Sequence, residues 1–190
     1  MPAVSRFTEL TQWVSYQRAV VDIALPPHTV RVTQASSGGR SGLSYPFGCE
    51  QPMHIITAFN PRGSSTPVRA NLRAQDELLR TLVLRGLQWW PAVGGDPVGT
   101  HAEISAAVIG MDDSQARELG RRFGQDAVFA WSPISWRLLG CVEAVHDTVA
   151  AGWHVDPLPV HRPLRSLSVS SQRAPHPSSR LPRTPKEQRP

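Results

Sequence analysis

At 190 residues the chain is long enough for one domain with flexible termini, and its hydrophobic fraction of 40% is enough for a buried core. Residues 155–190 carry seven basic and two acidic residues and so account for the whole net charge of +5, which argues against a dedicated nucleic-acid groove in the body. The sequence has no apolar run near the roughly 18–20 residues of a membrane span and no apolar leader segment, so we expect a cytoplasmic protein.

The first part of the chain predicts an arm followed by a β-hairpin. Residues 1–18 form the arm, which we expect to be helical from Thr8. Residues 19–25 are an apolar, β-branched run, and residues 29–35 alternate apolar with polar side chains, which is typical of a half-buried strand. Only a Pro-Pro-His turn separates the two runs. Residues 36–52, rich in Gly and Ser, predict a loop.

A central strand and a long helix come next. Residues 54–60 (HIITAFN) are apolar on both faces, which favours a central strand. Thr66 as N-cap and Pro67 at the first helical position predict a helix over residues 67–85 that ends at Gly86. Its predicted apolar stripe consists of Val68, Leu72, Leu79, Leu82 and Val83.

The second half predicts six more elements, four strands and two helical segments. The segment 87–93 is a strand that contains Pro91, so we expect it at an edge or with a bulge. Residues 101–110 form the next strand, and a helix over residues 113–123 is capped by Asp112, Asp113 or Ser114. Residues 126–131 and 135–143 are predicted as neighbouring strands, and residues 144–153 as a final turn of helix.

These elements predict one α+β domain over residues 19–153. It has a mixed, largely antiparallel sheet with two main helices, 67–85 and 113–123, packed on one face. Residues 154–190 are rich in Pro, Ser and Arg and bury too little apolar surface to offset their ordering entropy, so we expect a disordered basic tail.

Five elements of the central stretch carry a family resemblance. They are TAFNP (57–61), Asn71, VGGDP (93–97), Glu103 and RFGQDAV (122–128). In order and spacing they resemble an uncharacterised bacterial family, domain of unknown function 3293, from residue 16 to residue 132. No single motif is diagnostic. The family has no established activity, so the resemblance implies a domain limit and residues to test, but no mechanism.

Polar residues gather around the end of the central strand. Asn60 ends that strand and Arg62 comes just after it, and Asn71 and Gln75 lie one helical turn apart on one helix face. An arginine beside the free N–H groups of a helix start favours an anionic ligand. The alternative is structural: Asn60 closes a turn, a hydroxyl caps the helix, and Arg62 is solvated.

Glu103 is the one carboxylate in the middle of the strand 101–110, whose other residues have a composition typical of a buried strand. Because an unpaired buried charge is costly, it needs Arg62, Arg69 or Arg73 as a partner, or a solvent-facing position, or a raised pKa. With a raised pKa it would be a general base, and it is the only candidate for that role.

Other polar residues carry weaker indications. Asp96 either stabilises a turn or contacts a ligand. Gln125 either forms a hydrogen bond across the sheet or binds a ligand. The seven histidines form no metal-binding pattern, so we expect no metal site. Cys49 and Cys141 lie far apart in sequence, and a reduced pair is favoured over a disulfide.

The sequence therefore predicts a domain that binds a small anionic or nucleotide-like ligand, without indicating a reaction or a cofactor. The candidate ligand-binding residues are Asn60, Arg62, Asn71, Gln75, Asp96, Glu103 and Gln125. The alternative is a protein-interaction module whose basic tail makes weak, salt-dependent contacts with nucleic acid or other polyanions.

Overall fold

The computed structural model describes residues 15–35, 39–47, 51–143, 147–150 and 152–159. By its internal contacts the chain divides into two units, Met1–Val160 and His161–Pro190, and all described residues belong to the first. Of the predicted arm, residues 15–17 are helical, and residues 1–14 lie outside the described part. The predicted tail lies outside it from residue 160 onward.

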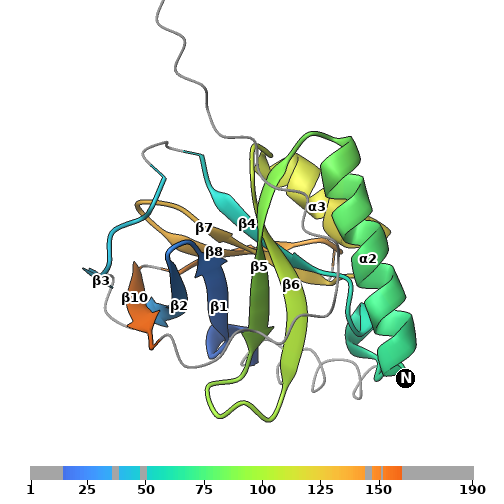
Figure 1. The fold of residues 1–190 in the computed structure, drawn as a ribbon, viewed down its shortest axis with the longest axis horizontal. Coiled ribbons are helices and arrows are strands. Elements are labelled where there is room, and N and C mark those ends of the chain that lie inside the picture. The colour runs from blue at the N-terminus through green and yellow to red at the C-terminus, as the bar shows by residue number, and fades with distance from the viewer. Residues whose placement is uncertain (1–14, 36–38, 48–50, 144–146, 151, 160–190) are drawn as a thin grey trace, which may run out of the picture. The chain divides into compact units, whose positions relative to one another are not determined.

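A strongly curled sheet forms the body of this unit (Figure 1). Its ten strands lie in the order β3-β10-β2-β1-β5-β6-β4-β7-β8-β9, and every neighbouring pair is antiparallel except β10 and β3. The prediction of a mixed, largely antiparallel sheet is confirmed, whereas its curl into a half-barrel was not predicted. The strands are β1 (Val20–Leu25), β2 (His28–Ala35), β3 (Arg40–Gly42), β4 (Met53–Thr57), β5 (Gln88–Gly95), β6 (Ala102–Ile109), β7 (Ala127–Trp131), β8 (Trp136–Gly140), β9 (Thr148–Ala150) and β10 (Gly152–Leu158).

The predicted hairpin is present as β1 and β2, paired in antiparallel register. Its apolar positions, such as Val21 and Val32, are fully buried in a core cluster that also contains Trp131, Trp136 and Trp153. Strand alternation therefore directs one face of the hairpin into the core and leaves polar residues on the other.

The predicted central position of β4 is confirmed, because β4 pairs with β6 on one side and β7 on the other. The expected edge position of β5 is wrong, since β5 lies between β1 and β6. The ladder with β1 begins only at Ala92, so Pro91 has a neighbour on the β6 side alone. A proline without an N–H is tolerated in this interior strand for that reason.

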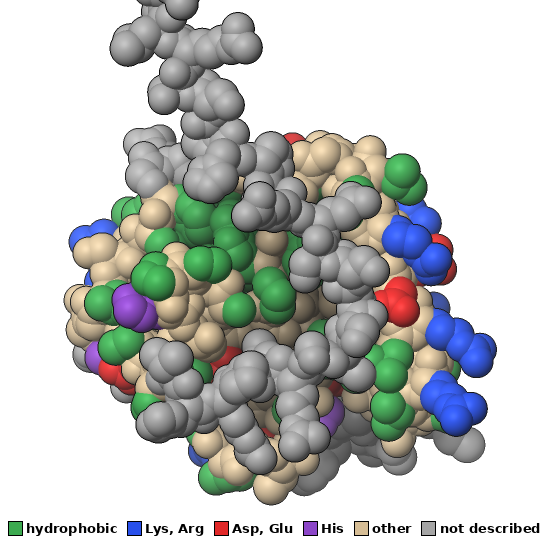
Figure 2. Space-filling model, viewed as in Figure 1, with side chains coloured by type: hydrophobic (Ala, Val, Ile, Leu, Met, Phe, Trp, Pro, Cys, Tyr) green, Lys and Arg blue, Asp and Glu red, His purple; other side chains and the backbone are tan. Residues whose placement is uncertain are grey.

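Helix α2 (Val68–Leu84) buries only part of the predicted stripe, with Leu82 fully buried. Arginine side chains gather over its outer face (Figure 2). Its N-cap is Pro67, without a side-chain cap, so the prediction of Thr66 as N-cap was wrong. Val68 and Val83 of the predicted stripe are 68% and 57% exposed. The buried residues of the helix are Asn71, Gln75, Leu78, Thr81 and Leu82. Three of these five buried residues are polar, so a pattern of apolar residues could not identify the whole buried face.

Helix α3 (Asp113–Arg122) begins as predicted, with Asp112 as N-cap in a capping box with Gln115. Leu119 of α3 and Leu82 of α2 belong to one apolar cluster with Ile56 of β4 and Val128 of β7. Among the described residues, no helix is both long and apolar enough to cross a membrane.

The C-terminal part of the sheet corrects two predictions. Residues 148–150 and 152–158 form strands β9 and β10, where a turn of helix was expected over 144–153. The predicted domain end at residue 153 falls inside β10, so residues 154–158 belong to the sheet. Trp153 and Val155 are 4% and 1% exposed and alternate with polar residues, a strand pattern that the proline-rich composition of the segment concealed.

Candidate functional site

Asn60 is the centre of a polar cluster at the end of β4. It adopts a left-handed conformation (φ 46°), which asparagine tolerates better than most residues. Its N–H donates to Asn71 Oδ1 at 2.9 Å, and its Nδ2 donates to Glu103 Oε1 at 2.8 Å. Its Oδ1 accepts from Asn71 Nδ2 at 3.0 Å and from the Thr66 N–H at 3.2 Å. Asn60, Asn71 and Glu103 of the candidate residues therefore lie together.

Gln75 and Gln125 extend this cluster along the backbone that leaves the sheet. Gln75 Oε1 accepts from the Ala58 N–H at 3.0 Å, and Gln125 Nε2 donates to the Phe59 carbonyl at 2.9 Å. Strand β4 ends at Thr57, so the next residues lose their ladder partners while still buried. Buried backbone groups need hydrogen bonds, and these amide side chains supply them. This is a structural role that the sequence alone did not separate from ligand binding.

Glu103 lies in β6 with 18% of its side chain exposed. Its partners in the described part of the chain are Asn60 and His101, whose Nε2 lies 3.3 Å from Glu103 Oε1. None of the arginines expected as its partner fills that role there. Glu103 thus helps to hold the strand-end turn through Asn60.

Arg62 and Asp96 do not join these contacts. Arg62 has φ 56°, and its N–H donates to the Gly124 carbonyl at 2.8 Å, while its side chain is exposed. Asp96 accepts from the N–H groups of Thr100 and His101 and from the Thr100 hydroxyl. The hydrogen bond from that hydroxyl is the main reason that the pKa of Asp96 is lowered. Asp96 therefore has the ordinary turn role, at the tip of the β5–β6 hairpin.

A cleft of about 420 Å³ lies beside the polar cluster, between the start of α2 and the end of α3. Asn71 belongs to both, because it lines the cleft and is only 3% exposed. The Arg122 guanidinium lies 5.6 Å from the centre of the Phe123 ring and 3.4 Å from Glu77 Oε1. The lining residues are Ala58, Pro61, Thr66, Ala70, Asn71, Ala74, Arg122, Phe123 and Gly124.

Sequence analysis identified Asn71 but not the rest of this lining. Arg122 and Phe123 lie within the RFGQDAV segment, so family resemblance pointed to their neighbourhood without assigning them a role. The end of α3 and the start of α2 are brought together by the tertiary fold, and local sequence patterns do not predict this proximity.

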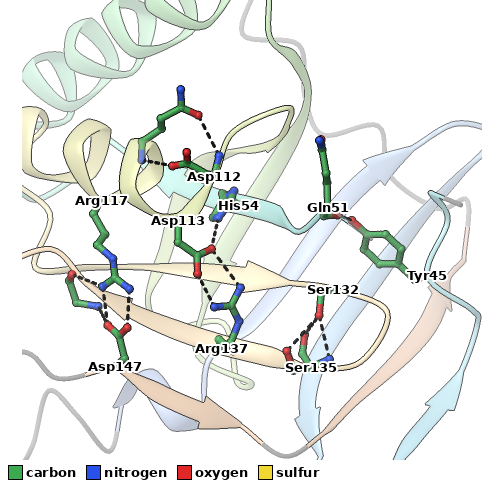
Figure 3. A network of polar contacts seen from close by, with 12 residues as sticks. Tyr45, Gln51, His54, Asp112, Asp113, Arg117, Ser132, Ser135, Arg137 and Asp147 are labelled. Atoms are coloured by element: carbon green, nitrogen blue, oxygen red, sulfur yellow. Dashed lines mark hydrogen bonds and ion pairs between the residues drawn. The ribbon is translucent and has the colours of Figure 1, made fainter. Parts of the chain in front are cut away.

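A second polar network surrounds His54, which is fully buried in β4 (Figure 3). His54 Nε2 lies 3.0 Å from Asp113 Oδ1, and Arg137 binds both carboxylate oxygens of Asp113, at 2.5 and 3.1 Å. Burial lowers the pKa of His54 despite the neighbouring carboxylate. Burial also acts to raise the pKa of Asp113, but the hydrogen bonds from Arg137 and His54 outweigh it and lower that pKa. Sequence patterns did not predict this network, because its members are 24 or more residues apart.

Of the two cysteines, only Cys141 lies within the described residues. Cys141 is buried and free, and burial raises the pKa of its thiol to about 11. Cys49 lies outside the described residues, so the predicted reduced pair is not addressed by the fold. No group of three or more His, Cys, Asp and Glu side chains in the described ranges could hold a metal ion.

Fold and cluster together define a class: an α+β domain with a curled, largely antiparallel sheet, in which amide side chains hold the turn after the central strand. Within that class, residues 56–128 match the family described as protein of unknown function DUF3293. The match confirms the resemblance read from the sequence, within narrower limits than the predicted residues 16–132, and it contains every residue of the polar cluster. Comparison with curated proteins and with solved structures gave no match.

Proposed function

We propose that the domain binds a small anionic ligand with an apolar body in the cleft between α2 and α3. The observation that carries this proposal is the position of Asn71. Its amide is buried at the wall of the cleft, where Asn60 and Thr66 accept both Nδ2 hydrogens and fix its orientation, so the amide can only accept a further hydrogen bond, through Oδ1. Ligand sites combine largely apolar walls with a few fixed polar groups, commonly in volumes of about 300–1,000 Å³.

Arg122 supplies the positive charge in this proposal. Its contact with Glu77 is long, at 3.4 Å, and half of its side chain is exposed. Exposed ion pairs contribute little, so an anion can compete for this guanidinium at small cost. Phe123 and the alanines at 58, 70 and 74 provide the apolar wall. Arg62 follows Pro61 of that wall and is a second cation to test. Glu103 is not among the lining residues, so the proposal concerns binding and includes no reaction.

A ligand screen with a matched pair of variants tests the proposal. Thermal shift would be measured with inorganic phosphate, phenyl phosphate, benzoate and adenosine monophosphate. A binding compound should raise the melting temperature of the wild type and of Arg73→Ala, an exposed α2 residue outside the lining, but not of Arg122→Ala. An equal shift in both variants would remove Arg122 from the site, and no shift with any compound would count against the proposal.

We also propose that α2 and α3 cover a single face of the central strands. Support comes from the apolar cluster that Leu78 and Leu82 of α2 share with Ala116 and Leu119 of α3. The alternative function, protein interaction assisted by the basic tail, depends on residues 160–190, which lie outside the described residues, so it stays a prediction. This alternative would be favoured if the protein binds a polyanion with strong salt dependence and loses that binding when residues 161–190 are removed.

A further inference from the structure

A serine, a histidine and an aspartate are hydrogen-bonded in series at the β3 end of the sheet. Ser41 Oγ lies 2.7 Å from His154 Nδ1, and His154 Nε2 lies 2.9 Å from Asp156 Oδ1. Ser41 is in β3 and is the direct register partner of His154 in β10. In the described sheet β3 is an end strand, well separated from α2 (Figure 1).

Strand register fixes this arrangement. His154 and Asp156 are two residues apart on β10, so they share the face opposite to buried Val155. Asp156 is the register partner of Arg31, and Arg31 is held in turn by two hydrogen bonds to Asp22, of 2.7 and 2.8 Å. Arg31 therefore lies between Asp22 and Asp156 in a row of charges across β1, β2 and β10.

The hydrogen bonds set the tautomer of His154. An ionised carboxylate only accepts, so the proton shared with Asp156 lies on Nε2. Nδ1 then keeps its lone pair and faces the Ser41 hydroxyl. A hydroxyl beside a basic nitrogen, which is itself oriented by a third group, is the arrangement that activates a nucleophile.

Gly42 offers a donor for the oxyanion that such a nucleophile would create. The Trp153 N–H donates to the Gly39 carbonyl and the Leu43 N–H donates to the Val155 carbonyl, so residues 39 and 43 face β10. By alternation the Gly42 N–H faces the other side of β3. The N–H of the residue after the nucleophile is one oxyanion donor of the α/β-hydrolases. Gly42 has φ +80°, and a Cβ there would lie 1.9 Å from the Val155 carbonyl oxygen, so only glycine fits.

We propose that Ser41 is a nucleophile activated by His154 and Asp156, and that this edge of the sheet hydrolyses small acyl esters with good leaving groups. Ser41 is exposed and His154 is 40% exposed, so a small ester can reach the hydroxyl. The competing interpretation is a cross-strand polar contact without reactivity.

The reaction balances with water as the only co-substrate. Ser41 Oγ attacks the acyl carbon while its proton passes to His154 Nδ1. The bond to the leaving oxygen breaks, and the leaving group takes that proton. Water then attacks the acyl-serine, passes a proton to Nδ1, and releases the carboxylic acid as Ser41 regains its hydrogen.

The test uses the full chain and 4-nitrophenyl acetate. Release of 4-nitrophenolate would be followed by absorbance, and acetylated peptides would be mapped by mass spectrometry. The wild type and Ser44→Ala, an exposed serine on the same segment, should be acetylated at Ser41 at equal rates. Ser41→Ala should not react there, and His154→Gln should react about 100-fold more slowly, as expected for loss of a general base.

Two outcomes would overturn the proposal. One is acetylation that maps to other residues in the wild type. The other is a Ser41→Ala rate equal to that of Ser44→Ala while His154→Gln is slow, because the imidazole would then be the nucleophile itself. Mapping the adduct of a fluorophosphonate on the wild type needs no variant. It should label Ser41, and label elsewhere or nowhere would contradict the assignment even if a variant failed to fold.

Discussion

Asn60 and Asn71 exchange two hydrogen bonds across 11 residues of sequence: the Asn60 N–H donates to Asn71 Oδ1 at 2.9 Å, and Asn71 Nδ2 donates to Asn60 Oδ1 at 3.0 Å. This reciprocal pair ties the start of α2 to the end of the central strand. It also fixes the amide that lines the cleft. The proposed ligand site and the local stability of the fold therefore depend on the same side chain.

Asn71→Ala should destabilise the protein by about 1–3 kcal/mol, because it leaves the half-buried Asn60 N–H without its acceptor and the Thr66 carbonyl without a donor. The free energy of unfolding from urea titration measures the loss. Arg73→Ala, at an exposed position of the same helix, is the control and should change it by less than about 0.5 kcal/mol. Equal effects of the two substitutions would mean that the reciprocal pair does not hold α2.

Leu82→Ala should cost about 2–5 kcal/mol, because Leu82 is fully buried in the cluster shared by α2 and α3. Leu84→Ala is the matched control, since Leu84 is the same residue type two positions later and is 88% exposed. Chemical denaturation of both variants compares the two faces of α2. A larger loss in Leu84→Ala would show that the helix is docked through the other face.

His54 should make the protein less stable as the pH falls below about 6.5. Burial lowers the pKa of His54 in the folded state, so the unfolded chain binds the proton more readily. The contribution of neutral His54 to stability is complete above the pKa that this histidine has in the unfolded chain. It is lost as the pH falls from that value through the lower pKa of His54 in the folded protein. Unfolding free energies measured from pH 7.5 to 5 should therefore decline in the wild type.

The control for this pH effect is a pair of histidine variants. His54→Gln should flatten the decline, while His28→Gln, at an exposed position, should leave it unchanged. Titration of the His54 ring by NMR provides a direct reading in the wild type. A midpoint above 6.5 would contradict the account, because the ion pair with Asp113 would then outweigh burial.

Truncation should locate the true end of the domain. A chain that ends at residue 152 lacks most of β10, including the buried Trp153 and Val155, and should lose much of its melting temperature. A chain that ends at residue 160 keeps the whole contact unit and should melt close to the full-length protein. If the two truncated chains melt alike, β10 is not integral to the sheet.

The sequence predicts this fold well wherever periodicity and burial coincide. The hairpin of β1 and β2 and the capping of α3 by Asp112 follow from alternation and cap chemistry, and both are confirmed. The buried stripe of α2 was predicted only in part, at Leu82, because Asn71 and Gln75 are polar residues whose partners are backbone groups of the strand end. A polar residue that is buried with its partner cannot be separated from an exposed one by hydropathy alone.

The candidate site was predicted in part for a related reason. Asn60, Asn71 and Glu103 converge as their positions at the end of β4, in α2 and in β6 suggested, whereas Arg62 and Asp96 have local roles. The cleft itself depends on how the end of α3 approaches the start of α2. Contacts such as that of His154 with Ser41, 113 residues apart, depend on strand order, which no local pattern encodes.

The most direct test of the proposed ligand site is an amide chemical-shift map of the ¹⁵N-labelled protein, titrated with a compound that raises its melting temperature. The proposal predicts that the largest shifts occur at Thr66, Asn71, Phe123 and Gly124, which line the cleft from both sides. Arg122→Ala should weaken these shifts, and Arg73→Ala should not. Shifts concentrated on another surface, with these four amides unmoved, would contradict the proposal that this cleft is the ligand site.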